Sequence, residues 1–197
     1  KNHSGRIAIC DRFHQNILWC VKRMSYKKFN DEVYYTQDSI TKILLIDIEI
    51  LKEMAGQNLR KRARLCTHAD VNDSVHEMLI VHAKNCYVPP HKHLGKSESF
   101  HLIEGQLDVV IFSDDGKIID VVHMGIHGTD KVFYYRLQES YYHTVIPLTD
   151  WVVFHETTKG PFDRSKTLFA SWAPEEDDHE KHKPYLTKLL DRISNFK

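Results

Sequence analysis

Two histidines separated by a single residue, His91 and His93, strongly limit what this 197-residue chain can fold into. In an extended segment alternate side chains point to the same face, so both imidazoles would lie together on one side of a strand. Glu98 follows five residues after His93, and Gly105 follows seven residues after Glu98. Two imidazoles and a carboxylate on adjoining strands, with coordination positions left open, suit a divalent first-row metal. The stretch 85–105 therefore predicts a metal site within β-structure.

The spacing of these residues resembles the first motif of the cupin family, G-x5-H-x-H-x4-E-x6-G. Asn85 stands at the opening glycine, and asparagine is the ordinary residue that best tolerates a positive φ. The second cupin motif, P-x-G-x-x-H, is matched less fully, because Gln138 and Ser140 replace its proline and glycine. Together the two motifs predict four metal ligands: His91, His93, Glu98 and His143.

Other histidines are weaker candidates for the same site. The chain contains 14 histidines, so an H-x-H pair by itself is unremarkable. Four further residues are alternative ligands: His101, His123, His127 and His155. His101 falls on the strand face opposite Glu98, which indicates an exposed or interface histidine.

From residue 78 onward the sequence has the pattern of short strands, rich in β-branched and aromatic residues. The predicted strands are Met78–His82, Phe100–Ile103, Leu107–Phe112, Ile118–Val122, Val132–Leu137, Tyr142–Pro147, Trp151–Glu156 and Leu168–Trp172. The S-D-D-G sequence at Ser113–Gly116 predicts a hairpin turn. Eight strands without intervening helical periodicity indicate an antiparallel barrel or a two-sheet jelly roll, and thus a mainly β fold of the cupin type.

One helix is predicted before the strands, with Asp47 as N-cap and an end near Ala63. Its apolar face would consist of Ile48, Leu51, Ala55 and Leu59. The basic stretch Arg60–Arg64 would complement the helix C-terminus, and its alternative role is to bind a phosphate or a nucleotide diphosphate.

A second helix is predicted at the end of the chain, with Pro184 as its first residue. Its apolar face would contain Tyr185, Leu186, Leu189, Leu190 and Ile193. The predicted organisation is an N-terminal extension (1–40), a helical arm (41–75), a barrel (76–174) and an acidic loop with a helix (175–197). Composition leaves open whether residues 1–23 are a natural extension.

Charge and cysteine usage exclude several classes of protein. Lysine plus arginine and aspartate plus glutamate both number 27, so no global field favours nucleic acid or an anionic membrane. Cys10, Cys20, Cys66 and Cys86 form no C-x-x-C pair, which argues against a disulfide framework or a cysteine-zinc site. No apolar run approaches the ~20 residues that span a bilayer, and the stretch 7–21 makes a poor signal peptide. We therefore expect a cytoplasmic protein.

A closer resemblance covers roughly residues 42–190. The chain resembles the WbuC-type cupin-fold metalloproteins in five stretches: R-K-R-A-R-L, Y-V-P-P-H-K-H, V-V-I-F-S-D-D-G-K, H-E-T-T-K-G-P-F-D and F-A-S-W-A-P-E-E-D. That family is associated with gene clusters for bacterial surface polysaccharide (O-antigen), and its reaction is not established. The resemblance implies a metal-binding cupin linked to sugar or nucleotide-sugar metabolism.

The leading functional hypothesis is a metal-dependent isomerase or epimerase that holds zinc, nickel, iron or manganese. Glu156 and Tyr142 are the candidate catalytic residues, although Tyr142 also suits packing in the barrel wall. The candidate substrate-binding residues are Tyr87, Lys96, Arg136 and Trp172, with the loop 159–162 crossing the barrel mouth. The alternatives are a non-catalytic metal- or carbohydrate-binding protein and an iron-dependent dioxygenase. A homodimer is expected because cupin barrels often pair through sheet edges.

Overall fold

The computed structural model describes residues 25–196 of the chain. The residues before Ser25, with Cys10, Cys20 and the apolar stretch 16–21, lie outside the described residues. Within the described part, neither helix has the length and apolar character needed to cross a membrane.

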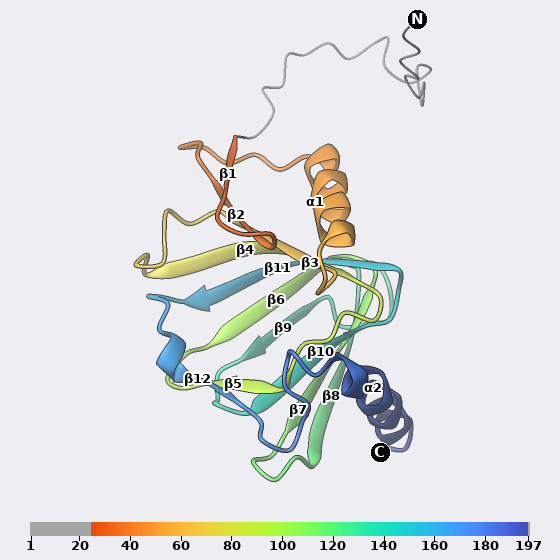
Figure 1. The fold of residues 1–197 in the computed structure, drawn as a ribbon. Helices are drawn as coiled ribbons and strands as arrows, with labels where there is room; N and C mark the ends of the chain where they lie inside the picture. Colours follow the sequence, from red (N-terminus) through yellow and green to blue (C-terminus); the bar gives the residue numbers. More distant parts are fainter. Residues whose placement is uncertain (1–24, 197) are drawn as a thin grey trace, which may run out of the picture.

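Two β-sheets face each other and form the body of the molecule (Figure 1). The larger sheet has the strand order β1–β2–β3–β4–β11–β6–β9, formed by Tyr26–Lys28, Val33–Thr36, Arg62–Cys66, Val75–Ala83, Trp151–Lys159, Glu98–Glu104 and Tyr134–Leu137. The smaller sheet has the order β12–β5–β10–β7–β8, formed by Thr167–Phe169, His91–His93, Tyr142–Pro147, Gln106–Phe112 and Ile118–Gly125. Two helices, α1 (Leu45–Gln57) and α2 (His179–Ser194), complete the fold with the short 3-10 turn Arg164–Lys166.

The main core lies between the two sheets, where alternate residues of each strand point inward. Its buried members include Met78, Ile80, Leu102 and Phe154 from the larger sheet and Leu107, Val109, Ile111 and Val145 from the smaller one. The outward-facing residues of the same strands pack against the helices. Helix α1 covers the larger sheet through Leu51 and Ala55, and α2 covers the smaller sheet through Leu189. Each sheet is therefore apolar on both faces over part of its area.

All eight predicted strands are present, with ends that differ from the prediction by up to three residues. The mainly β fold class is confirmed. The S-D-D-G turn is also present, because Ser113 and Lys117 close the β7–β8 hairpin by a backbone hydrogen bond of 2.9 Å. Asn85 has the positive φ of 68° that was expected at this motif position. At Gly105, with φ of 82°, a Cβ atom would lie 2.3 Å from the backbone oxygen of Trp151, so only glycine fits there.

The first helix differs from the prediction at both ends. It begins at Leu45, and Asp47 is its third residue, whose carboxylate accepts a 2.7 Å hydrogen bond from the backbone N–H of Leu44. It ends at Gln57, and Leu59 is 77% exposed beyond it. The predicted basic helix end is instead strand β3, in which the side chains of Arg62 and Arg64 point to one face while Ala63 and Leu65 are buried on the other. The alternation has period two, which the cluster of arginines obscures in the sequence.

Two further strands, β1 and β2, were not predicted, and β5 is the extended segment expected at His91 and His93. The first two extend the larger sheet, within the region predicted as extension and arm, and β2 pairs with β3 in parallel. The C-terminal helix starts at His179, so Pro184 lies inside it and not at its first position. Proline has no N–H to donate, so α2 lacks one backbone hydrogen bond there and depends on its packing against the sheet.

We predict that Leu189→Ala will lower the free energy of unfolding by about 2–4 kcal/mol, because Leu189 is only 1% exposed and anchors α2. The matched control is Leu190→Ala on the same helix, where the side chain is 41% exposed and the expected loss is below about 1 kcal/mol. Urea unfolding followed by circular dichroism measures both. Equal losses in the two variants would show that α2 is not docked through Leu189.

Candidate metal centre

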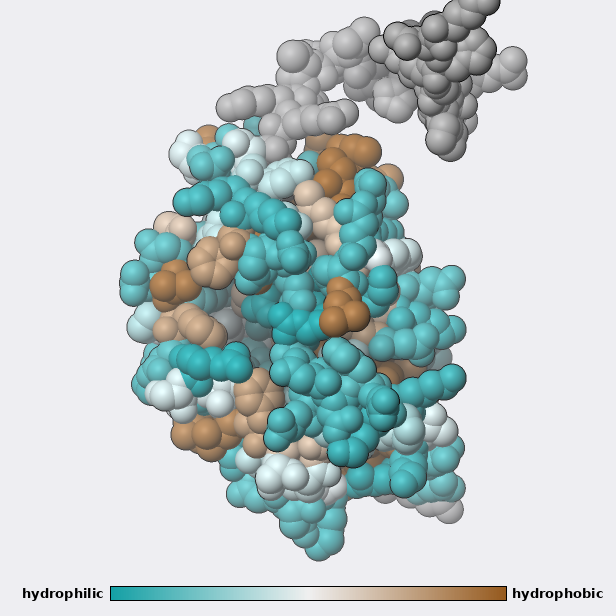
Figure 2. Space-filling view, in the orientation of Figure 1, coloured by the Kyte–Doolittle hydropathy of each residue, from teal (hydrophilic) through white to brown (hydrophobic). Residues whose placement is uncertain are grey.

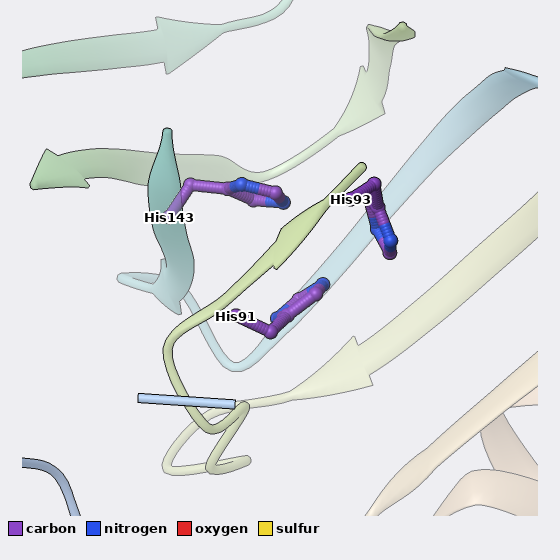
Figure 3. Close-up of side chains that lie close together, drawn as sticks. All are labelled: His91, His93 and His143. Carbon is purple, nitrogen blue, oxygen red and sulfur yellow. The ribbon is translucent and has the colours of Figure 1, made fainter. Parts of the chain in front are cut away.

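Three of the four predicted ligands come together through one pair of strands. His91 and His93 lie on β5, and His143 lies on β10 directly opposite His91 in the register. Their three rings turn toward a common space (Figure 3), and one nitrogen of each lies within 4.8 Å of the others. Among residues 25–196 this is the single group of three or more such side chains that are spaced to hold a metal ion.

The outward ring nitrogen of each histidine is fixed by a hydrogen bond. Nδ1 of His91 lies 2.9 Å from the carbonyl oxygen of Pro89, and Nδ1 of His143 lies 3.1 Å from that of Tyr141. A carbonyl oxygen can only accept, so these two Nδ1 atoms carry a proton, and each Nε2 faces the common space. Nδ1 of His93 is 3.1 Å from the hydroxyl oxygen of Thr167. Such second contacts hold the tautomer that a metal ligand needs.

Glu98, on the neighbouring sheet, completes the predicted set. Its side chain is buried, with Oε1 2.9 Å from Nε2 of His143 and Oε2 3.6 Å from Nε2 of His93. Oε1 and Nε2 of His143 form a buried ion pair when a proton lies between them. A buried carboxylate that faces imidazole lone pairs is costly unless a cation lies between them. The group of three histidines therefore fits a divalent transition metal, and Glu98 as the fourth ligand stays a prediction.

The protonation of the site also favours a cation. Burial, together with the neighbouring histidines, lowers the pKa of His91 to about 3, and burial also lowers the pKa of His93. Both imidazoles are therefore neutral and ready to bind a metal at neutral pH. Burial opposes charge on His143 and Glu98 as well, but their mutual attraction outweighs it, so the pKa of His143 is raised and that of Glu98 is lowered. A metal would take the place of the proton that this pair shares.

These ligands stand at one end of a cavity of about 280 Å³ between the sheets. The opposite end reaches β2 and β3, where Arg60, Arg62 and Arg64 line it. Phe162 and Phe169, both about half exposed, lie at its rim.

Hydrophilic residues cover most of the face seen in Figure 2, with an apolar patch at the start of α1, where Leu45 and Ile46 are exposed.

Of the two predicted catalytic residues, the structure brings only Glu156 to the cavity. It lies on β11, on the same face as Phe154, and forms no hydrogen bond or ion pair with any residue in 25–196. Burial, and then the nearby Glu98 carboxylate, raises the pKa of Glu156 to about 7. Tyr142 adjoins His143 in the strand and so points to the opposite face, where its ring packs against Trp172.

The four predicted substrate-binding residues lie outside the cavity. Tyr87 is buried under α2 and donates a 2.7 Å hydrogen bond to the carbonyl of Pro174. Lys96 donates a 2.8 Å hydrogen bond to the carbonyl of Pro161. Arg136 is exposed on the edge strand β9, because its neighbour Tyr135 points inward. Trp172 packs against Phe112 at the β7–β8 hairpin. Of the segment expected at the barrel mouth, Phe162 does line the cavity.

Sequence reasoning missed His82 as a cavity residue, and it considered Arg64 only within the basic stretch Arg60–Arg64, as an alternative phosphate-binding group on a helix. The alternation of Arg62 and Arg64 with Ala63 and Leu65 was the available signal for Arg64. His82 follows an apolar run in β4 and carries no motif. His101 is exposed, as expected for a residue on the face opposite Glu98.

In comparisons with known proteins, the chain matches one family model of unknown function and is remotely similar to several solved structures. Residues 46–124 match the family model DUF6016, described as a domain of unknown function, which includes the first motif but not His143. No curated protein matches the chain by sequence.

Three solved structures illustrate the structural likenesses. Protein SO0799 from Shewanella oneidensis has a TM-score of 0.44 at 9% identity, over 52% of this chain and 66% of that one. The cupin domain of Cnp3 from Schizosaccharomyces pombe has a TM-score of 0.40 at 12% identity, over 50% and 64%. The capsular polysaccharide assembling protein CapF from Staphylococcus aureus has a TM-score of 0.42 at 18% identity, over 54% and 31%.

The matched region is thus less than two thirds of each of these proteins. With such low scores, the cupin assignment rests on the strand order, on the β5–β10 register and on the geometry of the two histidine motifs. The fold is that of a cupin jelly-roll barrel, with a group of three histidines that can bind a metal. The WbuC-type resemblance stays a prediction.

We predict that His143→Ala will remove most of the bound divalent metal, since it deletes one ligand and frees the Glu98 carboxylate. Elemental analysis of protein purified without a histidine tag should give about one equivalent of metal for the wild type. The control is His101→Ala on β6, an exposed histidine outside the group, which should keep full occupancy. Full occupancy in His143→Ala would contradict the ligand assignment.

The raised pKa of Glu156 predicts a pH-dependent stability in metal-free protein. The neutral carboxyl is favoured in the folded state, so this stabilisation is present below the ordinary pKa of 4.5 and is lost as pH rises through about 7. Between pH 5 and 8 we expect Glu156→Gln to gain about 1–3 kcal/mol of unfolding free energy relative to wild type. Urea unfolding with chelator present measures this, and Glu77→Gln, an exposed change on β4, should show no such trend.

Proposed function

We propose that the protein is a metal-dependent enzyme that acts on a sugar or nucleotide-sugar and moves a proton between neighbouring carbons, as isomerases and epimerases do. One observation carries the proposal: the carboxyl group of Glu156, which forms no ion pair with any residue in 25–196, shares one cavity with the four proposed metal ligands. A titratable group without a structural partner, set beside a metal site, is a common arrangement for proton transfer.

The metal would be held by His91, His93, His143 and Glu98, with positions left for oxygen atoms of a substrate. When bound there, a divalent metal supplies Lewis acidity, which polarises a carbonyl group and makes the adjacent C–H more acidic. Zinc, nickel, iron and manganese all suit imidazole and carboxylate ligands.

Glu156 is the proposed proton-transfer residue. As a carboxylate it accepts a proton from the carbon next to the substrate carbonyl, and the electron pair of the C–H bond moves toward the carbonyl oxygen. The protonated Glu156 then returns the proton to the neighbouring carbon or to the opposite face, so no proton is gained or lost overall. A pKa of about 7 suits both directions of transfer at neutral pH, because donor and acceptor forms are then both populated.

The walls of the cavity support a small, partly apolar substrate. Phe162 and Phe169 at the rim offer ring faces, and Val145 and Phe154 exclude water from the interior. Aromatic surface beside polar groups is suited to a sugar ring. The assignment to surface-polysaccharide biosynthesis depends on the WbuC-type resemblance, and the homodimer and the cytoplasmic location likewise stay predictions.

The proposal is tested by proton exchange with solvent. Metal-loaded protein is incubated in deuterium oxide with a panel of aldoses and ketoses, and deuterium at the carbon next to the carbonyl is followed by NMR. We expect incorporation into at least one sugar, with a rate that rises with pH as Glu156 ionises. Glu156→Gln should lower that rate by about 100-fold or more, with metal content unchanged.

The outcomes separate the rival functions. Binding of sugars without exchange in the wild type would identify a non-catalytic binding protein. Oxygen consumption with substrate, and only in iron-loaded protein, would identify a dioxygenase. Exchange that persists at full rate in Glu156→Gln would leave the enzyme proposal standing and exclude Glu156 as its base.

A further inference from the structure

Arg64 differs from Arg60 and Arg62 in having no acidic partner within ion-pair distance. Arg164 also lines the cavity, where its guanidinium lies 5.2 Å from the ring centre of Phe169. Arg60 and Arg62 both pair with Glu32 and Glu176, in a network whose charges cancel. The partly buried guanidinium of Arg64 meets only the sulfur of Met78, at 3.9 Å, and forms no ion pair with any residue from 25 to 196. A guanidinium with five donors and one weak acceptor is under-satisfied in a partly closed site.

His82 lies at the same end of the cavity and is likewise unpartnered. It is 6% exposed, its ring stands edge-on to Phe154, and its Nδ1 is buried without a hydrogen-bond partner in the described part of the chain. Burial, and then the charges of Arg62 and Arg64, lowers the pKa of His82 to about 3, so the ring is neutral. A neutral imidazole always carries one N–H, and this group therefore offers a donor without adding charge.

The charges of the cavity favour an anion once a metal is present. The pairs formed by Arg60 and Arg62 cancel, which leaves Arg64, Arg164 and the metal against Glu98 and Glu156. Two positive charges from the metal and one from each of these two arginines exceed the one or two negative charges of the carboxylates. A ligand with a negative group near Arg64 would therefore be attracted in a site of low dielectric constant.

We propose that Arg64 and His82 bind an anionic oxygen group, a carboxylate or a monophosphate, of a monosaccharide-sized substrate whose other end reaches the metal ligands. The inference rests on the proposed function and narrows its substrate class to sugar acids or sugar phosphates. The planar guanidinium can donate two parallel hydrogen bonds to such a group, and the imidazole N–H a third. The cavity of about 280 Å³ lies just below the range of about 300–1,000 Å³ typical of pockets for drug-sized ligands, which suits a single sugar unit.

The test compares three probes of similar size: D-gluconate, D-glucose 6-phosphate and neutral D-glucose. Binding to full-length protein is measured by isothermal titration calorimetry, with zinc loaded and again with chelator. We expect at least one anionic probe to bind the zinc-loaded wild type at least about 10-fold more tightly than glucose. A preference for gluconate would identify a carboxylate, and a preference for glucose 6-phosphate a phosphate.

Variants assign the preference to Arg64. Arg64→Gln should weaken the binding of the favoured anion by about 10- to 100-fold and leave glucose binding and zinc content unchanged. Arg64→Lys should keep part of the preference. Lysine retains the positive charge but lacks the planar guanidinium that donates two parallel hydrogen bonds. The control is Arg136→Gln, which removes an exposed arginine outside the cavity. If Arg64→Gln proves unstable, Arg64→Met keeps apolar contact with Met78.

The results also separate this inference from the metal-dependent function. No anion preference in the wild type, or the same preference in Arg64→Gln, would overturn the assignment while zinc binding and proton exchange stood. If the wild type binds no metal but still prefers an anion in chelator, and that preference depends on Arg64, the metal-dependent function would be overturned. The anion site would stand.

Discussion

The antiparallel pairing of β5 with β10 sets His91 opposite His143, and the remainder of the site depends on that register. A shift of one residue in either strand would turn these histidines to the other face, because side chains alternate. Backbone carbonyls of Pro89 and Tyr141 then orient the rings through Nδ1. The apolar core between the sheets fixes which face of β10 points inward, since Val145 occupies the core on the same face of the strand as His143.

The two sheets supply different parts of the cavity. The smaller sheet carries the three histidines, whereas the larger one carries Glu98, Glu156 and Arg64 on β6, β11 and β3. Such a concentration of ionisable groups is tolerated because most are paired, and the packing of α1 and α2 outside the sheets stabilises the fold around them. Glu156, Arg64 and the unpartnered Nδ1 atom of His82 form no ion pair among residues 25–196, and all three residues line this one cavity.

The stretch around Arg62 shows where a local pattern misleads. Charged residues in succession after an apolar helix resemble a helix C-terminus, and the helical prediction extended to Ala63 for that reason. In the fold, Ala63 and Leu65 are buried under α1 while Arg62 and Arg64 point into the cavity. Pairing with β4 on one side and β2 on the other decided the strand, and neither contact is local in sequence. Tyr142 and Trp172 illustrate the opposite error. Their neighbours in the chain suggested that both residues belong to the site, but their side chains point away from the cavity.

The sequence by itself determined the eight strands of the barrel, the hairpin at Ser113–Gly116, the positive φ of Asn85 and the grouping of the three histidines. These depend on local alternation and on spacing, which are fixed by the geometry of an extended chain. Tertiary structure alone decided which polar residues share the cavity with the metal ligands. Glu156 was foreseen because it lies in an otherwise apolar strand, but Arg64 and His82 come from strands that the cupin motifs do not include. Their position follows from which strands pair and which face turns inward, and those are consequences of packing across the whole chain.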